Sequence, residues 1–195
     1  WLHRFRTGRE LARQRIETFF RKAHSLTELC AARVTIPTMV LALLGDFVSN
    51  SEMHGGEHAE SMGDAPMHAI IKAQNYIISG IEHLLTQAPQ RKIVIVAHSG
   101  NHARTTQKIR FNSENGHSLE YLMFKHLEAY FRNDPRVTFV IPEGPHSYLD
   151  IYNLTGRFQH GHMVKYAGGV GGLTVPLNKA IAQWDKARRA DLNVL

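Results

Sequence analysis

The stretch IVIVAHSGNHART, residues 93–105, carries the clearest information about the fold. It begins with four β-branched residues, which is typical of a buried strand. The polar residues Asn101, His102 and Arg104 follow shortly after that strand. Ligand sites in α/β proteins gather at the carboxyl ends of strands. The stretch therefore predicts a central strand and, directly after it, a candidate binding site.

Helical and strand-like segments alternate on both sides of this strand. Apolar residues recur at helical spacing over residues 9–32, 65–87, 118–132 and 176–189. Strands are predicted at residues 34–44, 92–97, 137–141, 147–153, 155–159 and 191–195. A turn at residues 153–156 is expected between the fourth and fifth strands. The pattern predicts one α/β domain, in which a layered β-sandwich is flanked by helices.

The composition limits which kinds of protein and which kinds of metal site are compatible with the chain. The 195 residues are 43% hydrophobic, which suffices for one domain with a sizeable core, and the net charge of +6 favours polyanionic partners. Thirteen histidines raise the expectation of a metal site. The single cysteine, Cys30, excludes an internal disulfide and a thiolate-rich zinc site, and it fits a cytoplasmic location. No apolar run approaches the roughly 20 residues of a membrane span, so no membrane partner is expected.

Metal-binding side chains follow two other predicted strands. Asp46 comes directly after residues 34–44, and His160 and His162 come directly after residues 155–159. Carboxylate oxygens and imidazole nitrogens bind Mn, Fe and Zn, and an amide oxygen is a weaker addition. Each residue also has an ordinary interpretation, as part of a turn or as a strand-end histidine bonded to a carbonyl. Together they predict a metal site where the strand ends meet.

Taken in order, these motifs resemble a known family. Gly45-Asp46, Gly100-Asn101-His102 and His160-Gly161 resemble the middle motifs of the calcineurin-like metallophosphoesterases, and the resemblance covers residues 40–161. That signature begins with Asp-x-His and ends with Gly-His-x-His, and neither motif occurs in the chain. Ala103 stands where the family usually has Asp or Glu. We therefore expect a metallophosphoesterase-like domain that is an interior piece of a longer one, with both missing motifs outside it.

The resemblance implies a role for each matching residue. Asp46 would bridge two divalent cations, Asn101 and His160 would bind the second of them, and His102 would be the catalytic histidine. His162 is the alternative to His160 as a ligand. The implied cofactors are two divalent metal ions, with Mn²⁺ expected first and Fe, Zn or Ni as alternatives. The chemistry is consistent, because two adjacent cations need a shared anionic oxygen and an imidazole can protonate a leaving group.

The resemblance implies a phosphoester substrate, and the basic residues help to distinguish a phosphodiester from a phosphomonoester. Arg104, Lys108 and Arg110 follow the central motif and either hold substrate phosphates or form a solvated loop. With the positive net charge, they favour a phosphodiesterase or nuclease acting on nucleic acid, similar to the DNA-repair nuclease branch that bacterial viruses also carry. A phosphomonoesterase or protein phosphatase is the alternative, and a non-catalytic scaffold of the same fold is another. His54 and His58 are better explained by a solvated loop than by a metal site.

Overall fold

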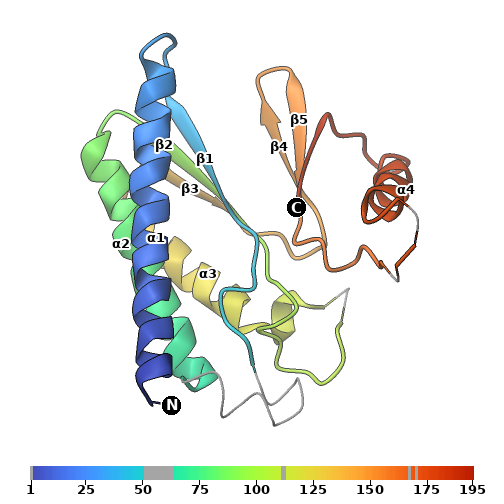
Figure 1. Ribbon diagram of the computed structural model, residues 1–195. Coiled ribbons are helices and arrows are strands. Elements are labelled where there is room, and N and C mark those ends of the chain that lie inside the picture. Colours follow the sequence, from blue (N-terminus) through green and yellow to red (C-terminus); the bar gives the residue numbers. More distant parts are fainter. Residues whose placement is uncertain (1, 51–63, 111–112, 167, 170) are drawn as a thin grey trace.

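The computed structural model describes residues 2–50, 64–110, 113–166, 168–169 and 171–195. Within this part, four α-helices and two three-stranded sheets form an α/β fold, which confirms the predicted α/β class, while the layered metallophosphoesterase-like sandwich stays a prediction. Figure 1 shows the two sheets side by side, with helices α1 and α2 beyond the first sheet and α4 beyond the second. No helix of the described part is both long enough and apolar enough to cross a membrane. His54 and His58 lie outside the described residues.

The first sheet contains the predicted central strand. Its order is β1 (Thr38–Leu43), β2 (Lys92–Ala97) and β3 (Val137–Val140), and all neighbours are parallel. Parallel neighbours need crossover connections, which α2 (Pro66–Gln87) and α3 (Leu119–Phe131) provide. The first strand begins at residue 38 and not at 34 as expected. Pro37 precedes it and has no N–H to extend the ladder, although its carbonyl accepts from the Lys92 amide.

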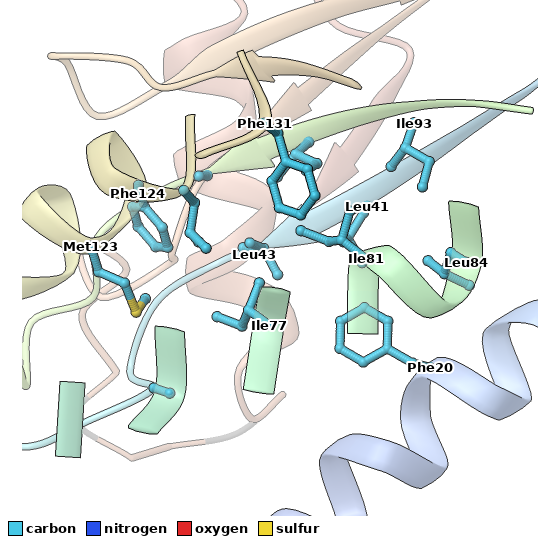
Figure 2. Packing of buried hydrophobic residues seen from close by; sticks show 14 of the residues in the cluster. Phe20, Leu41, Leu43, Ile77, Ile81, Leu84, Ile93, Met123, Phe124 and Phe131 are labelled. Atoms are coloured by element: carbon cyan, nitrogen blue, oxygen red, sulfur yellow. The ribbon is translucent and has the colours of Figure 1, made fainter. Parts of the chain in front are cut away.

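The main core lies between this sheet and its helices (Figure 2). Ile93 and Ile95 of β2 are at most 1% exposed, as expected for a parallel strand buried on both faces. Helix α1 (Leu2–Ala31) packs against α2 and inserts Phe20 beside Gly80. A Cβ at Gly80 would collide with the Phe20 ring, so the glycine permits the close helix contact.

The second sheet holds the C-terminal part of the chain. Its order is β4 (Ser147–Ile151), β5 (Leu154–Phe158) and β6 (Leu192–Val194), where β4 and β5 form an antiparallel hairpin and β6 is parallel to β5. Helix α4 (Thr174–Trp184) connects β5 to β6. The fully buried Arg157 joins these elements through Asp185 Oδ1 at 2.7 Å and Asn193 Oδ1 at 2.9 Å. The sheet is thus stabilised by a buried guanidinium that bonds to β6 and to the residue that follows α4.

Two predicted boundaries in this part were wrong. The hairpin turn contains Tyr152 and Asn153 and does not extend over residues 153–156, because Leu154 already pairs with Ile151. Tyr152 supplies the left-handed conformation of the turn with a φ of 56°, so the chain does not need Gly156 for it. Helix α4 ends at Trp184 and not at 189, and the following turn places Asp185 beside Arg157.

Candidate functional site

Three strand ends converge at one place, as the sequence predicted. Strand β1 leads into Asp46, β2 leads into Asn101 and His102, and β5 leads into His160. The backbone N–H of His98 still donates to Leu43 O at 2.9 Å, which extends the pairing of β1 and β2 to the point where the loops begin. The two sheets therefore bring their polar strand ends to a common site.

Two glycines allow the first two loops to touch. A Cβ at Gly45, which has a φ of 83°, would collide with the backbone of Gly100. A Cβ at Gly100 would collide with the Asp46 carboxylate. Asp46 itself has a φ of 56°, an uncommon conformation that Asp tolerates better than most residues. Both glycines of the two predicted motifs are thus needed for the close approach of the loops.

The Asp46 carboxylate is the centre of the site. Its Oδ1 accepts from the backbone N–H of His102 at 3.0 Å, and its Oδ2 lies 3.2 Å from His160 Nε2. Burial raises the pKa of Asp46, but the bonds from His160 and from the His102 backbone outweigh it and lower the pKa below the usual value. Asp46 is therefore a carboxylate at neutral pH.

The ring of His160 has a fixed orientation. Its Nδ1 faces the backbone carbonyl of Leu44, and because a carbonyl only accepts, this nitrogen carries a hydrogen. The opposite nitrogen, Nε2, lies 3.2 Å from Asp46 Oδ2 and 3.2 Å from Asn101 Oδ1. Burial lowers the pKa of His160, but its bonds to Asp46 and Leu44 raise it overall. A proton or a cation is therefore favoured between these three atoms.

His102 lies at the edge of this group. Its Nδ1 is 3.0 Å from Ser49 Oγ, and its Nε2 is 3.8 Å from Asp46 Oδ2. The side chain is 45% exposed, so a substrate bound at Asp46 could reach the ring. This position suits a proton donor better than a buried ligand.

His162 occupies a different environment from His160. Its Nε2 lies 3.5 Å from Glu114 Oε2. Burial lowers the pKa of His162 to about 4 and raises the pKa of Glu114 to about 7. Since His160 and not His162 is paired with Asp46, the geometry favours His160 as the ligand.

The three basic residues of the neighbouring loop differ in their surroundings. Arg104 is buried, and its guanidinium donates to the backbone carbonyls of Asn101 at 2.5 Å and Gln107 at 3.4 Å. It therefore holds the conformation of the loop that carries Asn101. Lys108 and Arg110 are exposed. Contact of these three residues with a substrate phosphate stays a prediction.

Two polar groups at the site were missed by the sequence analysis. Glu120, in the first turn of α3, is fully buried and accepts from the backbone N–H groups of Phe47 at 2.6 Å and Gly100 at 2.7 Å. His98 Nε2 lies 2.8 Å from Ser147 Oγ, and this buried contact joins β2 to β4. Neither residue belongs to a recognisable motif. The only sequence signal was an acidic residue two positions after the helix-capping Ser118.

A pocket lies next to these residues, between the loops of the two sheets. Its walls include His98, Glu114, residues 142–145 and residues 159–163. Because His160 belongs to this wall and also contacts Asp46, the pocket opens beside the candidate ligands. Asp46, Asn101 and His102 are not among its lining residues, so the pocket borders the candidate ligands through His160.

The ligand set is small in the part of the chain that the structure describes. No group of three or more His, Cys, Asp and Glu residues is arranged there to hold a metal ion. Asp46 and His160 are two such residues, and the third atom of the group is the amide oxygen of Asn101. No protein-family model matches the chain, and neither the curated proteins nor the solved structures gave a match. The assignment of a function therefore depends on the geometry of this site, on the charge of the chain and on the resemblance of its motifs.

Proposed function

We propose that this chain is a metal-dependent phosphoester hydrolase of the metallophosphoesterase type, with Asp46, Asn101 and His160 as metal ligands. One observation carries the proposal: His160 Nε2 lies 3.2 Å from both Asp46 Oδ2 and Asn101 Oδ1, with its hydrogen held on the other nitrogen. Adjacent ligands of an octahedral ion with bonds of about 2.1 Å are themselves about 3 Å apart. Both distances from His160 Nε2 therefore suit adjacent ligands of such an ion.

The surrounding contacts also fit a metal site. Ligating histidines usually donate their other ring N–H to a carbonyl or a carboxylate, and His160 donates to Leu44 O. The lowered pKa of Asp46 keeps an anionic oxygen available, and two cations would share that oxygen. Mn²⁺ is the first candidate for both cations, and Fe, Zn and Ni are the alternatives.

In the proposed reaction, Asp46, Asn101 and His160 would hold a divalent cation, which would supply polarisation of the phosphoryl oxygen and a lower pKa for an attacking water. The residues of the chain orient the reactants and move the proton. Asp46 and Asn101 would offer their side-chain oxygens to the cation, and the Leu44 carbonyl fixes the ring of His160. His102, whose ring is oriented by Ser49 Oγ, donates a proton to the leaving oxygen.

We propose a phosphodiester, and nucleic acid in particular, as the substrate class. The net charge of +6 supports a polyanionic substrate. Lys108 and Arg110, which follow Asn101 within nine positions of the chain and are exposed, support it as well. A phosphomonoesterase or protein phosphatase uses the same ligands and remains the alternative.

The test compares three substrates with Mn²⁺ and with EDTA. The substrates are a single-stranded oligonucleotide, bis-p-nitrophenyl phosphate and p-nitrophenyl phosphate. We expect Mn²⁺-dependent cleavage of both diesters. Faster hydrolysis of the monoester would favour the phosphomonoesterase. Mn²⁺ binding without hydrolysis of any substrate would favour the non-catalytic scaffold, and absence of both would refute the proposal.

A further inference from the structure

We propose that Glu120 is a positioning residue, whose carboxylate sets the distance between the loops that carry Asp46 and Asn101. This inference rests on the proposed metal-dependent function. The two oxygens of Glu120 accept from Phe47 N at 2.6 Å and from Gly100 N at 2.7 Å. Each of these N–H groups is next in the chain to a proposed ligand. A single side chain therefore connects the two ligand loops.

The connection leaves little freedom between the loops. Glu120 joins Phe47 and Gly100, and separately Asp46 Oδ1 accepts from the backbone N–H of His102 at 3.0 Å. In addition, Gly45 lies so close to the backbone of Gly100 that a Cβ on Gly45 would collide with it. The loops are thus held at three successive points, and a shift of the carboxylate would displace Asp46 relative to Asn101.

The surroundings of Glu120 indicate that its charge is not there for stability alone. The residue is fully buried beside the apolar Leu119, Met123 and Phe124 of the same helix. Burial of a carboxylate costs free energy, and a well-packed apolar residue often serves stability equally well. The anionic Asp46 close by adds repulsion. A cation bound at Asp46 would reduce that repulsion. The Glu120 clamp, meaning its bonds to Phe47 N and Gly100 N, and metal binding are therefore expected to stabilise each other.

The main variant is Glu120→Gln, which has almost the same size and replaces one acceptor oxygen with an NH₂ group. That group would face a backbone N–H, so one of the two bonds is lost. We expect Mn²⁺ affinity or kcat on bis-p-nitrophenyl phosphate to fall by about 10–100-fold, the usual effect of losing a residue that orients metal ligands. KM should change less than kcat. The matched control is Glu128→Gln, at a half-buried position of the same helix, where the carboxylate pairs with Lys125 and contacts neither ligand loop.

A second variant separates position from charge. Glu120→Asp keeps the carboxylate but shortens the side chain by one carbon–carbon bond, about 1.5 Å. A clamp requires the full length, so Asp should not restore Mn²⁺ affinity or kcat. Full restoration by Asp would show that only the charge matters and would overturn the positioning role. Folding of each variant is checked by circular dichroism.

A third measurement needs neither activity nor a variant. In the metal-free wild type, the amide protons of Phe47 and Gly100 should resonate far downfield, because short bonds to a carboxylate deshield them. Random-coil shifts for either amide would overturn the clamp. If wild type binds no Mn²⁺, the proposed function fails. If wild type binds Mn²⁺, and Glu120→Gln binds it equally and keeps the wild-type kcat, only the positioning role fails.

Discussion

Asp46 has an uncommon backbone conformation, and its carboxylate contacts both His160 and the backbone N–H of His102. Its φ of 56° turns the side chain towards His160 and the His102 amide, and the adjacent glycines leave space for this turn. Asp and Asn adopt this conformation more readily than most other residues. At the scale of single residues, the site can therefore be tested by changes that keep the backbone.

Asp46→Asn should abolish hydrolysis and strongly weaken Mn²⁺ binding. Asn fits the same backbone conformation, so the fold should persist while the anionic oxygen is lost. Isothermal titration with Mn²⁺ and the diester assay measure the effect, and Asp150→Asn at an exposed position is the control. Wild-type affinity in Asp46→Asn would contradict the ligand assignment.

His102→Ala should leave Mn²⁺ binding intact and lower kcat by about 10²–10⁴-fold, the usual contribution of a general acid. The ring is partly exposed and lies farther from Asp46 Oδ2 than the His160 ring does, at 3.8 Å against 3.2 Å. The loss should be smaller for aryl esters than for alkyl esters, because good leaving groups need less protonation. Equal losses would contradict the acid role, and loss of the metal would make His102 a ligand.

Contacts between elements decide how the ligands meet. Strands β2 and β4 are joined by His98 and Ser147, and α3 is joined to both ligand loops by Glu120. These contacts are buried and polar, so their loss leaves unpaired groups and costs more than the bond itself contributes.

The contact between β2 and β4 should make stability depend on pH. Burial, with the nearby His146 and His160, lowers the pKa of His98 to about 4 from its ordinary 6.5. The unfolded chain therefore binds a proton more readily, and stability should fall as pH drops from about 6.5 to about 4. The loss should approach about 3 kcal/mol and should level off below the folded pKa.

His98→Gln is the matched variant, because its amide can still reach Ser147 but does not titrate. Urea unfolding at several pH values between 4 and 7 measures the free energy of unfolding for both proteins. The variant should lose less stability than wild type over this range. Parallel curves would show that the acid sensitivity comes from other groups.

At the scale of the whole molecule, the fold brings together residues that are far apart in the chain. Parallel pairing places the carboxyl ends of β1 and β2 side by side, and β5 brings His160 to the same edge. The positive net charge adds a long-range attraction for polyanions, which depends on salt.

Replacing Lys108 and Arg110 by Gln should weaken oligonucleotide binding more than binding of p-nitrophenyl phosphate. Each phosphate contact on a single strand contributes about −0.7 to the slope of log affinity against log salt, so the slope should become shallower. Arg104 is left unchanged, because it holds the carbonyl of Asn101. Fluorescence anisotropy at several salt concentrations measures the slope, and an unchanged slope would identify a solvated loop.

The sequence by itself determined the elements and the residues at their ends. The bounds of β2 and the presence of α2 and α3 followed from local composition, because hydrophobic period and helix-ending residues act over a few positions. Asp46, Asn101, His102 and His160 were predicted as site residues for the same reason, since each follows a strand. The turn at Tyr152 was missed because pairing with the partner strand decided it.

Only the tertiary structure decided which polar groups are buried and what they contact. Glu120 looks like an ordinary charge in the first turn of a helix, but it bonds to Phe47, 73 positions away. Arg104 looks available to a substrate, but its guanidinium is bonded to carbonyls of its own loop. A buried charge must find partners wherever the fold places them, and those partners are backbone groups that have no signature in the sequence.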